Sequence, residues 1–272
     1  MNSTSTTHIG ALIPVRLASE RLSGKALREI CGRPALYHLL DRVCASRHLQ
    51  PNRVIVCTTV DESDDLLVTA VEDYGCATFR GSRDDLIKRL HDAIESYQFD
   101  AVIQVDGDDI LCDPFYMDAT MDLLIGDRSL DIVTCQGLPL GVASKSFTAS
   151  AMRRVYQHYR TQQNDTGFSY FFTRTGLCNV GVIRPFSSDH VLDEARLTLD
   201  YEEDLAVFRK ILEALYVPGT IPAGLADVVR FLRSQPAIMS LNQSLDDEYW
   251  ERTRKKAQLE FVDPAGEVKR IT

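Results

Sequence analysis

The sequence predicts an α/β protein built around a mostly parallel β-sheet. Short apolar runs alternate along the chain with amphipathic segments of helical length, and the 272 residues, 44% of them hydrophobic, suit one large α/β domain with an appendage. Strands joined by crossover helices run parallel, so their carboxyl ends meet at one edge of the sheet. Ligands of such sheets bind beyond that edge, which is where functional residues are expected.

The N-terminal half contains four expected strands and three expected helices. The first strand is an apolar run, and the helix after it opens at Pro34, because proline suits a first helical turn and apolar residues then recur at helical spacing. Aspartates at N-cap positions begin the next two helices. The expected strands are Ile9 to Val15, Arg53 to Thr59, Cys76 to Phe79 and Ala101 to Val105, and the later helices run from Asp61 to Tyr74 and from Asp84 or Asp85 to Tyr97.

The C-terminal half continues the same alternation up to about residue 216. Helices are expected at 114–125, 148–159 and 200–215, and strands at 131–135, 178–183 and 196–199. Three prolines break the chain after this point. We therefore divide the chain into a main domain, 1–216, and a helical appendage, 217–272, with helices at 225–232 and 246–256, packed on the same domain or at a dimer interface.

Charge and cysteine usage exclude several classes of protein. The net charge of −9 disfavours sequence-independent nucleic-acid binding, since a phosphate polymer repels an acidic chain. Seven scattered cysteines, with no Cys-x-x-Cys pair, argue against a disulfide framework or a structural zinc site, and we interpret them as reduced, mostly buried thiols. The polar start, MNSTSTTH, and the absence of a long apolar run predict a cytoplasmic protein without membrane spans.

A basic loop follows the first expected strand and is the strongest functional signal. The segment Arg16–Leu27 gathers Arg16, Arg21 and Lys25 around small residues, and exposed amides in such a turn can bind an anion. It is not a Walker loop, because the first glycine of that motif and the hydroxyl residue after the lysine are missing. The alternative is a solvated basic loop that binds no ligand. Residues expected to contact a nucleotide here are Leu17, Ala18, Ser19, Arg21, Gly24 and Lys25.

Carboxylates follow two other expected strands. Asp106, Asp108 and Asp109 come directly after the strand at 101–105, and Asp200 ends the run at 197–199. Clustered carboxylates repel one another unless a cation neutralises them, and Mg²⁺ prefers hard oxygen ligands together with phosphates. Ordinary Asx turns are the alternative for the first group, and an N-cap with Glu203 in a capping box is compatible with the second. If the strands are neighbours, Asp108 and Asp200 hold one magnesium ion from two sides.

Four motifs in this order resemble a known family. The loop at 16–27, the pair Gly107-Asp108, the segment Phe79–Asp85 (Phe-Arg-Gly-Ser-Arg-Asp-Asp) and the run Leu197–Asp200 (Leu-Thr-Leu-Asp) are similar to cytidylyltransferases that activate acidic sugars, including CMP-Kdo and CMP-sialate synthetases. The resemblance is strongest to the branch named for the spore coat polysaccharide protein SpsF. It spans roughly residues 9–212, and four ordered motifs are far more specific than one loop.

The resemblance implies a three-layer α/β/α nucleotide-diphospho-sugar transferase fold and transfer of CMP from CTP to an acceptor oxygen, with Mg²⁺ as cofactor. It implies Lys25, Arg16, Asp108 and Asp200 as catalytic residues, Asp108 and Asp200 as metal ligands, and nucleotide contacts from Arg80, Gly81, Ser82 and Asp106. Asp109-Ile110 stands where relatives usually have Cys-Pro or Glu-Pro, which leaves the metal ligand open among Asp106, Asp108 and Asp109.

The acceptor region differs from the family pattern. Gly141, Ser144, Lys145 and Arg174 are the expected acceptor-binding residues. The expected reaction is Mg²⁺-dependent activation of an acidic acceptor, a ulosonic or nonulosonic sugar acid, for surface polysaccharide synthesis by a homodimer. One alternative is a nucleotidyltransferase acting on a phosphonate, a sugar phosphate or another phosphorylated acceptor. The other is a nucleotide-binding module without catalysis.

Overall fold

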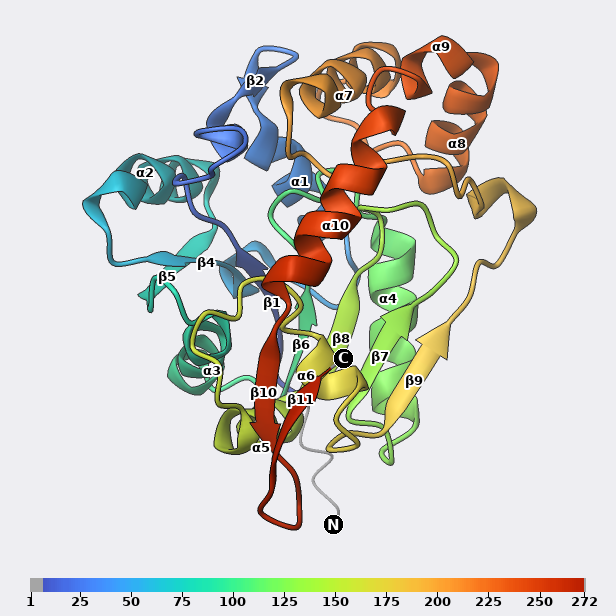
Figure 1. The fold of residues 1–272 in the computed structure, drawn as a ribbon. Helices are drawn as coiled ribbons and strands as arrows, with labels where there is room; N and C mark the ends of the chain where they lie inside the picture. The colour runs from blue at the N-terminus through green and yellow to red at the C-terminus, as the bar shows by residue number, and fades with distance from the viewer. Residues whose placement is uncertain (1–6, 272) are drawn as a thin grey trace, which may run out of the picture.

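A seven-stranded mixed sheet forms the centre of the computed structural model, which describes residues 7–271 (Figure 1). The strand order is β5-β4-β1-β6-β8-β7-β9, and within this sheet β8 alone runs antiparallel to its neighbours. The strands are β1 (Ile9–Pro14), β4 (Val54–Thr59), β5 (Ala77–Gly81), β6 (Ala101–Gln104), β7 (Ile132–Cys135), β8 (Lys145–Thr148) and β9 (Val180–Ile183). The predicted mostly parallel sheet is confirmed.

Helices cover both faces of the sheet and give the three layers. Strands β1, β4 and β6 are almost wholly buried, because parallel strands need cover on both faces. One face packs against α1 (Ala35–Cys44), α2 (Asp65–Tyr74), α4 (Pro114–Gly126), α7 (Glu202–Leu215) and α8 (Leu225–Ser234). The other packs against α3 (Leu86–Tyr97), α5 (Ala149–His158) and α6 (Tyr170–Thr173). The predicted α/β/α class is therefore confirmed.

The C-terminal segment crosses the molecule from one side to the other. After α9 (Pro236–Met239), helix α10 (Asp246–Lys256) runs over the front in Figure 1 and leads into a hairpin of β10 (Leu259–Val262) and β11 (Val268–Ile271). Leu259 and Phe261 are buried in the core on the α3–α5 face. The part of the chain from α9 onward thus contacts both layers of helices. Ile238 and Met239 of α9 pack against one core, β10 packs into the other, and α10 lies between them.

Several shorter elements complete the chain, and the sequence patterns did not predict them. A small hairpin joins β2 (Glu29–Ile30) to β3 (Arg33–Pro34), and short 3-10 helices lie at η1 (Lys25–Leu27), η2 (Pro51–Arg53), η3 (Glu62–Asp64), η4 (Ser188–His190) and η5 (Gln243–Leu245). The antiparallel strand β8 and the β10–β11 hairpin were not predicted, because four-residue strands carry little periodicity.

The expected strand at 196–199 is wrong. Within that run a single isolated bridge joins Arg196 to Leu140, and the backbone of Leu197 donates to the Leu140 carbonyl at 2.8 Å. Leu197 and Leu199 of this apolar run are buried in the same core as the apolar residues of α7 and α8. The hydrophobicity of the run therefore reflects the packing of a connecting segment and not a strand. The helix expected from Asp200 begins two residues later, at Glu202.

The cysteine prediction holds in part. All seven cysteines are free, as expected, although one is exposed, three are half-buried and three are buried. Residues 1–6 of the polar start lie outside the described residues. Within 7–271, no helix is long and apolar enough to span a membrane.

Candidate active site

The loop at residues 16–24, called the phosphate loop here after its predicted role, curls back on itself directly after β1. The carbonyl of Leu17 accepts from the amides of both Ser19 and Gly24, at 2.7 and 3.1 Å, and Gly24 adopts a left-handed conformation with φ 63°. The carboxylate of Asp64 holds the start of the loop by accepting from the Leu17 amide at 2.8 Å. Sequence reasoning missed Asp64, since it reads as an ordinary residue at a helix start.

The far side of this loop presents backbone donors. Within residues 7–271, the amide N–H groups of Glu20, Arg21, Leu22 and Ser23 find no acceptor. Successive unpaired amides in a turn form an anion-binding concavity. This geometry fits the phosphate-binding role that the sequence predicts for the loop.

The carboxylate turn, residues 106–109, is pressed against the end of β1. A Cβ on Gly107 would lie 2.4 Å from Val15 Cγ2 and 2.6 Å from the Pro14 carbonyl oxygen, so only glycine fits. The Asp109 amide donates to the Asp106 carbonyl at 3.0 Å and closes the turn. The position of the aspartates relative to the phosphate loop is therefore set by backbone contact.

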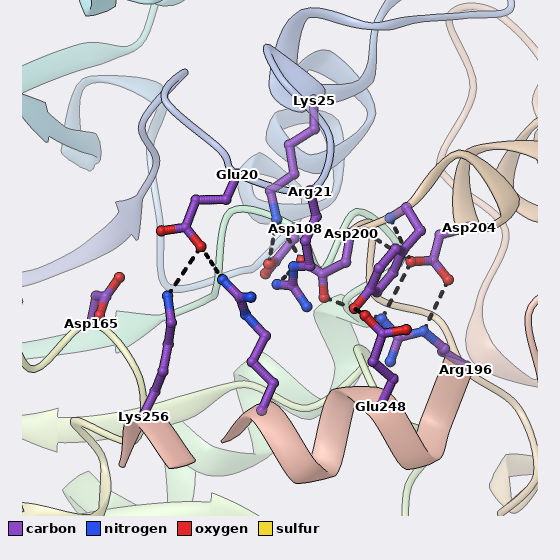
Figure 2. Close-up of polar contacts among 12 residues, drawn as sticks. Glu20, Arg21, Lys25, Asp108, Asp165, Arg196, Asp200, Asp204, Glu248 and Lys256 are labelled. Atoms are coloured by element: carbon purple, nitrogen blue, oxygen red, sulfur yellow. Dashed lines mark hydrogen bonds and ion pairs between the residues drawn. The ribbon is translucent and has the colours of Figure 1, made fainter. Parts of the chain in front are cut away.

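Lys25 sits between the two predicted metal ligands. Its Nζ lies 2.7 Å from Asp108 Oδ2 and 2.9 Å from Asp200 Oδ1 (Figure 2). The Leu199 amide donates to the Asp108 carbonyl at 2.9 Å, which ties the two carboxylate-bearing segments together. Burial opposes ionisation of Asp108, but the Lys25 ammonium outweighs it and lowers the pKa of this carboxyl. The structure thus brings together three predicted site residues from distant segments.

A second layer of charges holds Asp200 in place. Arg21 Nη2 lies 2.6 Å from Asp200 Oδ1, and the fully buried Arg196 donates to Asp200 Oδ2 at 3.2 Å and to Asp204 Oδ1 at 3.0 Å. The ring of Tyr249 from α10 covers the Arg196 guanidinium at 4.6 Å. Sequence reasoning missed Arg196 and Tyr249; the signal for the first was a basic residue four positions before a carboxylate.

The predicted capping role of Asp200 and Glu203 is wrong. The carboxylate of Asp204 accepts from the amides of Asp200 and Tyr201, at 2.9 and 3.0 Å, so Asp204 caps the start of α7. Asp200 is consequently left with both carboxylate oxygens directed at cations rather than at its own helix.

The donor set of this cluster fits a divalent cation. Asp108 and Asp200 converge on a single cationic atom, Lys25 Nζ, which occupies the place between two carboxylates. No group of three or more His, Cys, Asp or Glu side chains arranged for a metal occurs within residues 7–271. Mg²⁺ commonly takes one or two carboxylates together with substrate phosphates, so two are enough.

The remaining residues of the carboxylate turn have different environments. Asp106 accepts from Gln104 Nε2 at 2.8 Å and pairs with Lys145 Nζ at 2.9 Å, which places a predicted acceptor-binding lysine beside the cluster. Asp109 is buried, and burial together with the Asp108 and Asp106 carboxylates raises its pKa well above the usual range. Of the three aspartates of the turn, Asp108 is the one that shares a cation with Asp200.

Other predicted nucleotide contacts are engaged within the protein. Arg16 pairs with Asp165 at 2.7 Å. Arg80 donates to the carbonyls of Thr59 and Asp61, at 2.9 and 2.8 Å, and so holds the connection between β4 and α2. Gly81 ends β5, and the Ser82 hydroxyl accepts from the Asp85 amide at 3.3 Å. Their contacts with a nucleotide stay predictions.

Three of the four expected acceptor residues, Gly141, Ser144 and Arg174, differ in burial and in their contacts. A Cβ on Gly141 would lie 2.0 Å from the Leu197 carbonyl oxygen, so this glycine allows close packing against the segment that carries Asp200. The Ser144 hydroxyl is buried and has no partner within residues 7–271, and the Arg174 guanidinium stacks on the Tyr170 ring at 3.7 Å. Acceptor contacts from these residues stay predictions.

Comparisons with known proteins identify the family of the chain. The family model for cytidylyltransferases matches residues 10–178. An uncharacterized protein of Methanocaldococcus jannaschii is 27% identical over 236 residues, covering 86% of this chain and 94% of that protein. The 3-deoxy-manno-octulosonate cytidylyltransferase of Yersinia pseudotuberculosis is 33% identical over 170 residues, covering 60% of this chain. The chain spans about three fifths, 61%, of the length of that relative.

Two solved structures show the same fold. A cytidylyltransferase from Leptospira borgpetersenii superposes with a TM-score of 0.77 at 24% identity, covering 86% of this chain and 97% of that chain. A CMP:2-keto-3-deoxy-manno-octonic acid synthetase complexed with CTP gives a TM-score of 0.61 at 15% identity, covering 76% and 99%. Family membership favours an enzyme over the module without catalysis. The chain belongs to the cytidylyltransferase family and is a CTP-dependent nucleotidyltransferase.

Proposed function

We propose that this cytidylyltransferase transfers CMP from CTP to an acidic sugar of the ulosonate or nonulosonate type, with Mg²⁺, for surface polysaccharide synthesis. The observation that carries the proposal is Lys25 Nζ held between Asp108 and Asp200, directly beside a loop with unpaired amides. The relative named for 3-deoxy-manno-octulosonate supports an acidic sugar as the acceptor class.

Asp108 and Asp200 are the residues that would hold the magnesium ion. When bound, it would supply positive charge to the α-phosphate and to the departing pyrophosphate. Lys25 and Arg21 neutralise these carboxylates in the structure described here. Once the carboxylates have another cation, both side chains become available to the phosphate oxygens, and the amides of the loop add further donors.

The reaction is a displacement at the α-phosphorus. The acceptor oxygen forms a bond to this phosphorus while the bond to the oxygen that bridges the α- and β-phosphates breaks, and pyrophosphate leaves with that oxygen. A sugar hydroxyl must lose its proton on the way. Asp106, with a side chain 40% exposed and paired with Lys145, is better placed to accept the proton than the buried Asp109, whose pKa is raised.

The acceptor carboxylate needs cations of its own. Lys145 lies beside the catalytic cluster on β8, and its Nζ contacts Asp106 at 2.9 Å and Gln104 Oε1 at 3.0 Å. We assign the acceptor carboxylate to Lys145 with help from Arg174 and the 141–144 segment. The carboxylate of an acidic acceptor would then pair with Lys145, whereas a neutral sugar would leave Lys145 paired with Asp106.

Pyrophosphate release tests the proposal. The purified chain would be assayed with Mg²⁺ and each of the four nucleoside triphosphates, against separate pools of ulosonic acids, phosphonates and sugar phosphates, with Asp200→Asn as the inactive control. Release with CTP and the sugar acids alone supports the proposal. Release with phosphonates or sugar phosphates instead would assign another acceptor class, and activity that survives removal of divalent metal by EDTA would contradict the metal role.

We also propose that the chain acts as a homodimer. Phe115 and Phe186 are 52% and 60% exposed and contact each other edge to face at 5.2 Å, near the edge strand β9. Exposed aromatic clusters beside a free strand edge are typical of interfaces. Sedimentation equilibrium would show a dimer, which Phe186→Ser would weaken.

A further inference from the structure

Helix α10 lays one face over the phosphate loop. Asp246, Tyr249, Arg252 and Lys256 are three or four residues apart, so they share a single helical face. Figure 2 shows Lys256 pointing from the helix toward Glu20 of the loop. The ligand of the two cations on this face, Arg252 and Lys256, rests on the function proposed above.

The N-terminal half of α10 is anchored to the buried charge network. Asp246 lies 3.6 Å from Arg196 Nη1, Tyr249 covers the Arg196 guanidinium, and the Glu248 carboxylate accepts from the Tyr201 hydroxyl at 3.0 Å. The ring of Tyr249 also lies 6.0 Å from the Arg21 guanidinium. These contacts fix the helix relative to the catalytic cluster, so the direction of its last turn is set.

The last turn of α10 reaches the tip of the phosphate loop. Arg252 and Lys256 both pair with the Glu20 carboxylate, Lys256 at 3.4 Å. Glu20 is the one acidic residue between positions 16 and 27, and its amide is the first of the four consecutive unpaired amides at 20–23. Its side chain is 68% exposed, and exposed ion pairs contribute little, so these contacts exchange easily.

The terminal phosphates of a nucleotide can use cations beyond those of the loop. A nucleoside triphosphate carries about four negative charges at neutral pH, concentrated on its terminal phosphates. Of the loop cations, Arg21 and Lys25 face the aspartates and Arg16 faces Asp165. Arg252 and Lys256 are further cations next to the unpaired amides, and a carboxylate already holds them there.

We propose that Arg252 and Lys256 bind the β- and γ-phosphates of CTP, the part that leaves as pyrophosphate. Until the nucleotide binds, the Glu20 carboxylate occupies the place of these phosphates. The phosphates displace the Glu20 carboxylate from the two cations, and Glu20 turns to solvent. Helix α10 thereby becomes part of the nucleotide site, and the C-terminal segment completes a site that the N-terminal half begins.

The test compares variants that break the same ion pairs from opposite sides. Binding of CTP and of inorganic pyrophosphate, each with Mg²⁺, would be measured by calorimetry without any acceptor. The double variant Arg252→Gln/Lys256→Gln should weaken both ligands about tenfold to a hundredfold, as expected for lost charge-assisted bonds. Glu20→Gln should leave affinity unchanged or raise it, because it frees the same cations.

Two controls keep the outcome clear. Lys255→Gln removes an exposed cation that pairs within the helix with Glu251, and it should leave binding unchanged. The swap Arg252→Lys/Lys256→Arg keeps both charges and should restore most of the affinity, even if the double glutamine variant loosens the helix. Equal weakening by Glu20→Gln and by the double variant, or no weakening by the double variant, would overturn the proposal.

The outcome separates this proposal from the proposed function. If the wild-type chain binds CTP and pyrophosphate with the expected differences but transfers CMP to none of the acceptors, the phosphate contacts stand and the proposed reaction fails. If the chain activates a sugar acid while all variants bind alike, the reaction stands and the role of Arg252 and Lys256 fails.

Discussion

Two groups of ion pairs meet at the phosphate loop, and they differ in burial. The inner group joins Lys25, Asp108, Asp200, Arg196 and Asp204, where the exposed fractions of the side chains run from 0% for Arg196 to 25% for Asp108. The outer group joins Glu20 to two cations of α10 that are 33% and 39% exposed.

The difference in burial separates a fixed framework from exchangeable contacts. Removing one partner of a buried pair leaves a charge without water or counterion, whereas water replaces either partner of an exposed pair. The inner group therefore holds Asp108 and Asp200, the proposed metal ligands, in position before any ligand arrives. The outer group can change partners, which is what a site for a departing product requires.

The largest expected effect is on turnover. Asp200→Asn should lower the rate of CMP transfer by about three orders of magnitude or more, since charge stabilisation at the transition state is usually the largest catalytic term. Single-turnover release of pyrophosphate measures it. The exposed Asp127→Asn serves as the control carboxylate. A rate within tenfold of the wild type would remove Asp200 from the metal site.

The next effect is on stability and compares the two groups directly. Arg196→Met should lower the free energy of unfolding by about 3–5 kcal/mol, because Asp200 and Asp204 would lose their buried partner. Arg252→Met in the outer group should cost less than about 1 kcal/mol. Urea denaturation measures both. Equal losses would show that burial does not separate the two groups.

A pH-dependent effect follows for Lys25. Its ammonium lowers the pKa of Asp108, so this pair stabilises the native state above the ordinary carboxyl pKa and ceases to do so as pH falls through the lowered value. Lys25→Met should therefore destabilise strongly from neutral pH down to the ordinary carboxyl pKa, and progressively less as pH falls further, through the lowered pKa of Asp108. Melting temperatures measured across this range test this, and a loss independent of pH would indicate a purely steric role.

The smallest expected effect concerns the acceptor. Lys145→Gln should raise the KM for the sugar acid about tenfold and leave the KM for CTP within about twofold, as expected for one lost charge-assisted hydrogen bond. Steady-state kinetics with each substrate varied in turn would measure this. If the KM for CTP rises instead, Lys145 belongs to the nucleotide site.

Local patterns were sufficient for most of the architecture. The apolar runs of β1, β4 and β6, and the helices that begin near Asp61, Asp85 and Pro114, follow from periodicity and capping residues that are close in sequence. The run at 196–199 misled because a buried connecting segment is as apolar as a strand. A strand and a buried connecting segment differ in their backbone hydrogen-bond partners, and these partners come from elsewhere in the chain.

The same division applies to the site. Arg21, Lys25, Asp108 and Asp200 were predicted, because basic loops and carboxylates after strands are visible in the sequence. Arg196, Asp64 and Tyr249 were not, because each acts on a predicted residue without carrying a motif. Only their contacts in space identify them.

By itself, the sequence determined the fold class, the phosphate loop and the carboxylate turn, since periodicity, turn chemistry and charge type act between residues that are near neighbours in the chain. The tertiary structure decided which charges meet. Lys25 reaches Asp200 across 175 positions and Lys256 reaches Glu20 across 236. Pairings over such separations depend on how the sheet orders its strands and where the last helix lies, and no local pattern encodes either.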